Sequence, residues 1–209
     1  MTGEPAKRTS FSLARVESYT DAVFAIAATL LVLDLTTTAF GKISSDAELW
    51  QALAGMWPTF MAFGVSFALL SGLWVSHMTQ FRDIGRADLV LVWLNNARLL
   101  FIVLIPFTTS LVSDYSDYYA GRMLLPINFF LAMALGIATW SWAASRDGHL
   151  LKEEAKADAG SQNIGSTAAL IAGAVTVALS PWLGSWAFLT FAVSGPISGV
   201  LQRRRAAGR

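Results

Sequence analysis

Long apolar stretches separated by short polar and charged connections dominate the sequence. The first stretch is centred on the run from Ala22 to Leu33, which contains no charged residue. About 20 apolar helical residues are needed to cross a bilayer core of ~30 Å. The pattern predicts an all-α membrane protein, with six transmembrane helices in one domain over residues 1–209. The expected spans are residues 19–38, 53–77, 89–112, 123–144, 164–180 and 182–201, with a turn at Ser180 and Pro181 between the last two.

Composition agrees with a lipid environment. Hydrophobic residues make up 55% of the chain and charged residues only 14%, whereas about a quarter of a soluble domain is charged. With a formal net charge of only +1, the chain is not expected to have the broad basic surface of nucleic-acid binders. The chain has no cysteine and only two histidines, in separate regions, so we expect no disulfide, no metal site and no cofactor.

Basic residues are distributed unequally between alternate connections. With six spans, the N-terminal arm, the 2–3 and 4–5 connections and the tail fall on one side. An excess of Lys and Arg marks the cytoplasmic side, so we expect a multi-pass plasma-membrane protein with both termini cytoplasmic. The opposite side carries Lys42 and Arg122, and Arg98 falls inside span three. The residues on the basic side are Lys7, Arg8, Arg15, Arg82, Arg86, Arg146, Lys152, Lys156, Arg203, Arg204, Arg205 and Arg209.

A cleaved signal peptide is the alternative for the first span, because basic residues precede a short apolar run. Asp21 stands at the start of that run, and no obvious small-x-small cleavage site follows it. A retained helix is therefore the favoured interpretation. The polar stretch over residues 146–163 is expected to form a cytoplasmic loop.

Span one carries most of the ionisable residues near membrane depth. Arg15, Glu17 and Asp21 open it and Asp34 closes it. Such residues are costly in lipid and are functional candidates by default. The alternative is that Arg15 and Glu17 are interfacial anchors and that Asp21 interacts with the dipole of the helix N-terminus.

The apolar part of span one contains a stripe of larger side chains. Ile26, Leu30 and Leu33 are spaced i, i+4 and i+7, which places them on one helix face. Thr29 lies beside that stripe, and small alanines on other faces allow close helix contact. The same spacing also fits large apolar side chains that only face lipid or pack inside the helix bundle.

The start of span one resembles a known signature. The segment Arg15-Val-Glu-Ser-Tyr19-Thr20-Asp21 is similar to the Arg-x-x-x-Phe-Ser-Asp motif of the transmembrane-protein-175 family. This family comprises endosomal and lysosomal potassium channels and their prokaryotic relatives. The chain keeps the Arg and the Asp at the same spacing, and it departs from the motif at Tyr19 and Thr20.

Spans two and three extend the resemblance. Trp74-Val-Ser-His77 is similar to the Trp-x-x-His of the family, and Asn95 and the segment Leu104-Ile-Pro-Phe107 also match. The matches cover spans one to three, and spans four to six show nothing diagnostic. A six-span length is that of the prokaryotic members.

The resemblance implies a homotetramer in which four first helices surround a potassium-conducting pore. Pore-lining rings of Ile26, Leu30 and Leu33 would form a hydrophobic gate, and Thr29 would contribute to selectivity near the constriction. The chain has no Thr-Val-Gly-Tyr-Gly filter, so selectivity would depend on pore width and on the cost of dehydrating the ion. The expected partners are three further copies of the chain, the bilayer and permeant potassium ions.

The resemblance also implies an interhelical polar network behind the pore helix. Its expected members are Arg15, Thr20, Asp21, His77 and Asn95, which would hold the helices in register. A ring of Asp34 carboxylates at the outer mouth would attract cations, although simple exposure at the membrane surface is the alternative for this residue.

Three other functions remain as alternatives. A proton-permeable channel of the same architecture differs only in the permeant ion. A proton-coupled secondary transporter would use Asp21 and His77 as its titrating pair, but the sequence shows no inverted repeat. A membrane enzyme is not favoured, because the few ionisable residues are scattered and no HExxH motif or nucleophile elbow occurs.

Overall fold

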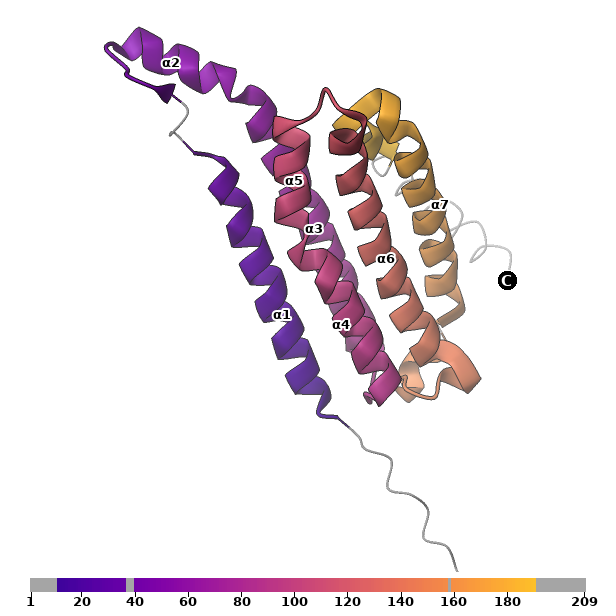
Figure 1. Cartoon of the computed structure of the whole chain (residues 1–209). Helices are drawn as coiled ribbons and strands as arrows, with labels where there is room; N and C mark the ends of the chain where they lie inside the picture. The colour runs from indigo at the N-terminus through magenta and orange to yellow at the C-terminus, as the bar shows by residue number, and fades with distance from the viewer. Residues whose placement is uncertain (1–10, 37–39, 158, 191–209) are drawn as a thin grey trace, which may run out of the picture.

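The computed structural model describes residues 11–36, 40–157 and 159–190, and these residues are almost entirely helical (Figure 1). Five helical segments among them are long and apolar enough to cross a membrane. The elements are α1 (Leu13–Leu30), η1 (Leu31–Asp34), α2 (Asp46–Gly55), α3 (Trp57–Asp83), α4 (Leu89–Val103), α5 (Ile105–Asp114), α6 (Tyr119–Gly148), η3 (Glu153–Ala155), α7 (Ala159–Leu183) and η4 (Gly184–Phe188).

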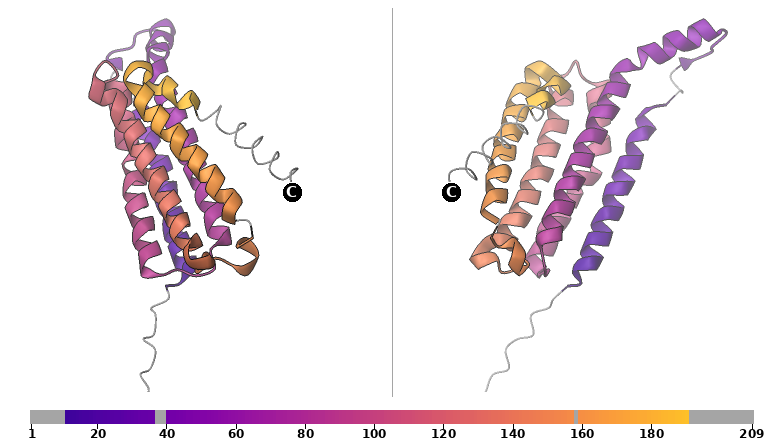
Figure 2. Two further views of the ribbon diagram at one scale, coloured as in Figure 1. Left: turned by 90° about the vertical axis from the view of Figure 1, so that its right-hand side faces the viewer. Right: turned by 180° about the vertical axis from the view of Figure 1, so that it is seen from behind.

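The long helices lie side by side in a bundle (Figures 1 and 2). Helix α6 packs against α4, α5 and α7, whereas α1 lies at the edge of the bundle against α3 and α4. The main apolar core forms where these helices meet. Its fully buried members include Leu31, Leu70, Ile102, Ile105 and Leu125.

The second span begins later than the hydropathy pattern predicts. Residues 53–55 belong to α2, a separate short helix that projects from the end of the bundle where α3 begins (Figure 1). Ser45 caps α2 by accepting a hydrogen bond from the Glu48 backbone N–H. Pro58 stands in the first turn of α3, where no intrahelical N–H is needed. Helix α3 then continues past the expected end at His77 to Asp83.

The third span is broken between α4 and α5 at Leu104. Pro106 has no N–H to donate to the carbonyl of Ile102, so the regular helix cannot continue through this point. The side-chain amide of Asn128, from α6, donates to the Phe101 carbonyl beside the break at 3.0 Å. A polar side chain of a neighbouring helix thereby compensates for the interrupted backbone.

The fourth span ends where expected. Regular geometry in α6 stops at Ala144, because Ser145 is extended and Arg146 and Asp147 have φ of 49° and 58°. The following polar segment folds back on the connection between α3 and α4: the Gly85 N–H donates to the Leu150 carbonyl at 2.8 Å.

The expected turn at Pro181 is not seen. Pro181 lies inside α7, which continues to Leu183. The helix stops before Gly184, whose φ of +55° is the left-handed conformation typical of helix C-termini. Of the expected sixth span, residues 182–190 form the end of α7, η4 and two further residues, and the remainder lies outside the described residues.

Candidate functional site

Helix α1 presents two different faces. Thr20, Phe24 and Ala27 are buried against the bundle. The predicted gate residues lie on another face: Ile26 is 57% exposed and Leu33 is 69% exposed in the single chain. Leu30 is also exposed, at 40%. A stripe of large apolar side chains therefore remains uncovered by the rest of the described chain.

Thr29 lies beside this stripe and is exposed. Its hydroxyl donates to the Ile26 carbonyl at 2.8 Å, so the donor is used within the helix. The hydroxyl oxygen can still accept a hydrogen bond or contact a cation.

Two of the predicted network residues meet across α1 and α4. Asn95 Nδ2 donates to Thr20 Oγ1 at 2.7 Å, and both residues are fully buried. Thr20 Oγ1 in turn donates to the Val16 carbonyl at 2.8 Å. This chain of hydrogen bonds fixes α1 against α4 at one depth and one rotation.

Asp21 is connected to α3 through a residue for which no role was predicted. Trp74 Nε1 donates to Asp21 Oδ1 at 3.0 Å. The Trp-x-x-His match contained the signal for this partner, because indole N–H groups need an acceptor in lipid. Asp21 therefore interacts with Trp74, and no hydrogen bond joins it to Arg15 or His77.

His77 is 1% exposed and stacks between aromatic rings. Its ring centroid lies 6.0 Å from that of Phe24 and 4.1 Å from that of Phe81. Its Nδ1 has no hydrogen-bond partner among the described residues. The structure thus places His77 in an aromatic cluster behind α1, apart from the hydrogen bonds of Thr20 and Asn95.

Arg15 does not join the network. It is exposed, and its side chain makes no hydrogen bond or ion pair within the described part of the chain. The cation that occupies the interior is Arg98, which is 1% exposed. Its Nη2 donates to the Leu73 carbonyl at 2.9 Å, and its Cζ lies 5.7 Å from the centre of the Phe24 ring.

Asp34 ends η1, the short helix that directly follows α1. Its Oδ1 accepts a hydrogen bond from Ser110 Oγ of α5 at 2.6 Å. Its Oδ2 is buried without a partner among the described residues. In the single chain, Asp34 is thus directed at least partly toward α5.

A metal-binding cluster of three or more His, Cys, Asp or Glu side chains is not found in the ranges that the structure describes. The described residues form instead a set of polar and aromatic contacts that hold α1 against the bundle. A stripe of large apolar side chains lies on the exposed side of the same helix.

Comparison with known proteins finds relatives of this chain. A family model described as "Endosomal/lysosomal potassium channel TMEM175" matches residues 15–106. "Potassium channel B446_29190" of Streptomyces collinus is 33% identical over 150 residues, which are 69% of this chain and 70% of the relative. "Potassium channel Cha6605_3372" of Chamaesiphon minutus is 34% identical over 144 residues, 68% of this chain and 70% of the relative.

Solved structures agree in fold. The crystal structure of a lysosomal potassium-selective channel TMEM175 homologue from Chamaesiphon minutus superposes with a TM-score of 0.69 at 29% identity. That superposition covers 89% of this chain and 97% of the solved chain. Residues 15–106, which match the family model, contain the exposed stripe of α1 and both hydrogen bonds that fix the helix. The chain belongs to the TMEM175 family of endosomal and lysosomal potassium channels and their bacterial homologues.

Proposed function

We propose that the chain forms a passive, potassium-permeable cation channel whose pore is lined by α1. The observation that carries the proposal is the exposed stripe of Ile26, Leu30 and Leu33, on a helix whose opposite side is fixed to the bundle. Two bacterial relatives that align over about two thirds of this chain are named potassium channels. Ion channels conduct without catalysing a reaction, and the sequence contains no HExxH motif and no nucleophile elbow.

The gate follows from the chemistry of that stripe. Four copies around a central axis would bring four Ile26 side chains together, and Leu30 and Leu33 would form further rings. A narrow apolar ring closes a pore by excluding water, and it opens when the helices rotate or splay. The Thr29 oxygen, next to the Ile26 ring, would favour partly dehydrated cations there.

The hydrogen bonds behind α1 support this gate. Thr20 is bonded to Asn95 on α4, and Asp21 is bonded to Trp74 on α3. Together they hold α1 at one rotation with the stripe toward the pore, and an opening rotation would have to break them. His77 contributes by packing its ring against Phe24. Asp34 would attract cations at the outer mouth through the negative potential of its carboxylate, because one of its oxygens is buried and the other accepts from Ser110.

The orientation in the membrane follows from the basic residues. The backbone carbonyl of Arg82 accepts from Lys152 Nζ, and Arg86 donates to the His149 carbonyl, so the 2–3 and 4–5 connections meet at one end of the bundle. The start of α1, with Arg15, is at the same end (Figure 1). We place this end in the cytoplasm, because Lys and Arg are retained on that side, and we place the channel in the plasma membrane with both termini inside.

Proton permeation is the second candidate. Vertebrate relatives, such as that of Bos taurus at 30% identity, are named endosomal/lysosomal proton channels, but the aligned region covers only 32% of the bovine protein. Hydrophobic constrictions that wet transiently conduct protons along water chains, so one gate can serve both ions.

Flux through reconstituted vesicles tests both candidates. Potassium-loaded vesicles that contain the protein should lose potassium faster than potassium-loaded vesicles without protein. Vesicles with the Ile26→Asn variant should leak at least several-fold faster still, because four asparagine side chains around the pore no longer repel water. Ile171→Asn is the matched control, since Ile171 is 60% exposed on α7, away from the stripe. The channel proposal would be refuted if vesicles that contain the protein showed no potassium flux and no proton flux above that of protein-free vesicles at any pH or potential.

A further inference from the structure

Arg98 is a buried cation without a counter-ion among the residues that the structure describes. Its Nε and Nη1 have no hydrogen-bond partner among the described residues, although the side chain is 1% exposed. The Leu73 carbonyl and the face of Phe24 are its partners among the described residues, and neither carries a formal negative charge. A buried, unpaired guanidinium is strongly unfavourable in a low-dielectric interior.

Among the described residues no carboxylate supplies the missing charge, and Glu4 and Asp158 are the acidic residues outside them. No ion pair joins Arg98 to a carboxylate within the described ranges. The sequence after Thr190 contains no Asp or Glu at all. A cation–π contact such as that with Phe24 offsets only part of the cost of the burial.

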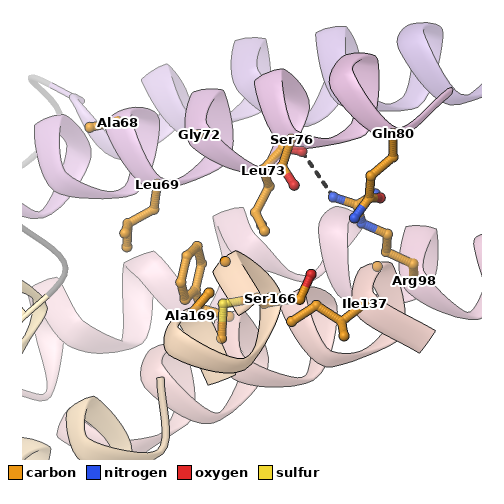
Figure 3. Close-up of a pocket in the computed structure, with 14 residues that line it drawn as sticks. Ala68, Leu69, Gly72, Leu73, Ser76, Gln80, Arg98, Ile137, Ser166 and Ala169 are labelled. Atoms are coloured by element: carbon orange, nitrogen blue, oxygen red, sulfur yellow. Dashed lines mark hydrogen bonds between the residues drawn. The ribbon is translucent and has the colours of Figure 1, made fainter. Parts of the chain in front are cut away.

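Arg98 borders an open cavity of about 390 Å³ between α3, α6 and α7 (Figure 3). Gln80 and Ser166 lie at the polar side of this cavity with Arg98, and Leu69, Ile137 and Ala169 belong to its apolar lining. Gln80 Oε1 is likewise buried without a partner among the described residues. Exchanging the two amide positions of Gln80, which also lines the cavity, would place an NH₂ group where Oε1 now lies.

The space around the guanidinium depends on a glycine. A Cβ added to Gly136 of α6 would lie 3.0 Å from Arg98 Cζ. Any larger residue there would push the guanidinium out of its present position. The packing of α4 against α6 is therefore adapted to hold this cation at the edge of the cavity.

We propose that this cavity is a binding site for an anionic group, and that the Arg98 guanidinium, whose Nε and Nη1 are buried in this structure, turns toward the group with help from Gln80 and Ser166. The parallel N–H groups of a guanidinium, from Nε with Nη2 or from Nη1 with Nη2, donate to the two oxygens of a carboxylate or phosphate, and a single N–H group donates to a halide. The group is either a free small anion or the head of an amphiphile whose chain lies along the apolar lining. The site is independent of the pore face of α1, so its test does not depend on ion conduction.

Thermal unfolding of the full chain in a non-ionic detergent tests the site at constant ionic strength. Chloride, formate and decanoate are each titrated against gluconate, whose hydroxyls would be left unpaired in a mostly apolar cavity. We expect a saturable rise in Tm, because a ligand that binds only the folded state stabilises it. A rise with chloride or formate indicates a free anion, and a rise with decanoate alone indicates an amphiphile head group.

Two variants and a control make the result specific. Arg98→Gln removes the charge and should abolish the rise. Ser166→Leu keeps Arg98 but fills the cavity, so it should abolish the rise even if Arg98→Gln fails to fold. Thr79→Leu, a polar-to-leucine change at an exposed position of α3 outside the cavity, should respond like the wild type. Equal Tm values of the wild-type protein in all four anions, or a rise that persists in Ser166→Leu, would overturn the proposal and leave water as the occupant.

Discussion

Single polar side chains in this protein act where helices must keep a fixed rotation. The hydrogen bond between Asn95 and Thr20 is predictable from sequence, because a buried amide and a hydroxyl in apolar helices have few other partners. The pairing of Asp21 with Trp74 was missed, because tryptophan in a membrane helix is more often interfacial or packing bulk. Arg98 was placed inside span three, but its partner was not predicted, because that partner is the Leu73 backbone carbonyl, which no side-chain pattern reveals.

Replacing Asn95 tests the first of these interactions. Asn95→Leu should lower the free energy of unfolding by about 1–3 kcal/mol, because the interhelical hydrogen bond is lost and a larger side chain enters a full site. Asn96→Leu is the control, since Asn96 is the exposed neighbour on the same helix. Detergent-based equilibrium unfolding measures both variants. Equal stability of the two would show that the Thr20 contact is dispensable.

Removing either side of the Asp21 interaction should weaken assembly. Asp21→Ala and Trp74→Phe both free α1 to rotate, so the stripe no longer meets its copies correctly, and we expect a smaller oligomeric fraction in detergent. Trp93→Phe serves as the control, because Trp93 is 63% exposed on α4. Size-exclusion chromatography with light scattering gives the fractions, and unchanged oligomers in the first two variants would contradict the positioning role.

At the level of helices, hydropathy locates spans more reliably than their interruptions. The break at Leu104 falls inside one continuous apolar run, so only Pro106 signals it. The end of α7 was placed too early, because Pro181 was taken as the turn although Gly184 carries the left-handed backbone. The separate helix α2 was missed because its last residues are as apolar as the start of a span. Interruptions depend on single backbone donors and on φ angles, which averaging over a window conceals.

Close contact between α6 and α7 depends on Gly173. A Cβ at this position would lie 2.4 Å from Met133 Cε and 2.9 Å from the Phe130 ring. Gly173→Val should therefore destabilise the protein by about 1–3 kcal/mol, because both side chains must repack. Gly160→Val, in the same helix, has open space around its Cβ and should change stability much less. The two variants are compared by thermal unfolding, and the same Tm for both would show that α6 and α7 separate without cost.

The whole molecule raises the question of what covers the stripe on α1. Large apolar side chains at an exposed helix edge can face lipid, so exposure alone does not require a partner. The additional observation is that α1 is fixed by polar contacts on its other side, which would be needless for a helix that only faces lipid. Four copies with α1 at the centre satisfy both facts, because each stripe then faces a common axis.

Cysteine chemistry can test this arrangement, since the chain contains no cysteine and one introduced thiol is therefore unique. Leu33→Cys near the end of the stripe should form disulfide-linked pairs of subunits under mild oxidation, and charged thiol reagents should reduce potassium flux through it. Ile171→Cys on α7 should do neither, although Ile171 is comparably exposed in the single chain. Native mass spectrometry of the same samples should give four subunits. A monomer, a dimer, or cross-linking at position 171 in place of 33 would refute a central α1 and assign the stripe to lipid.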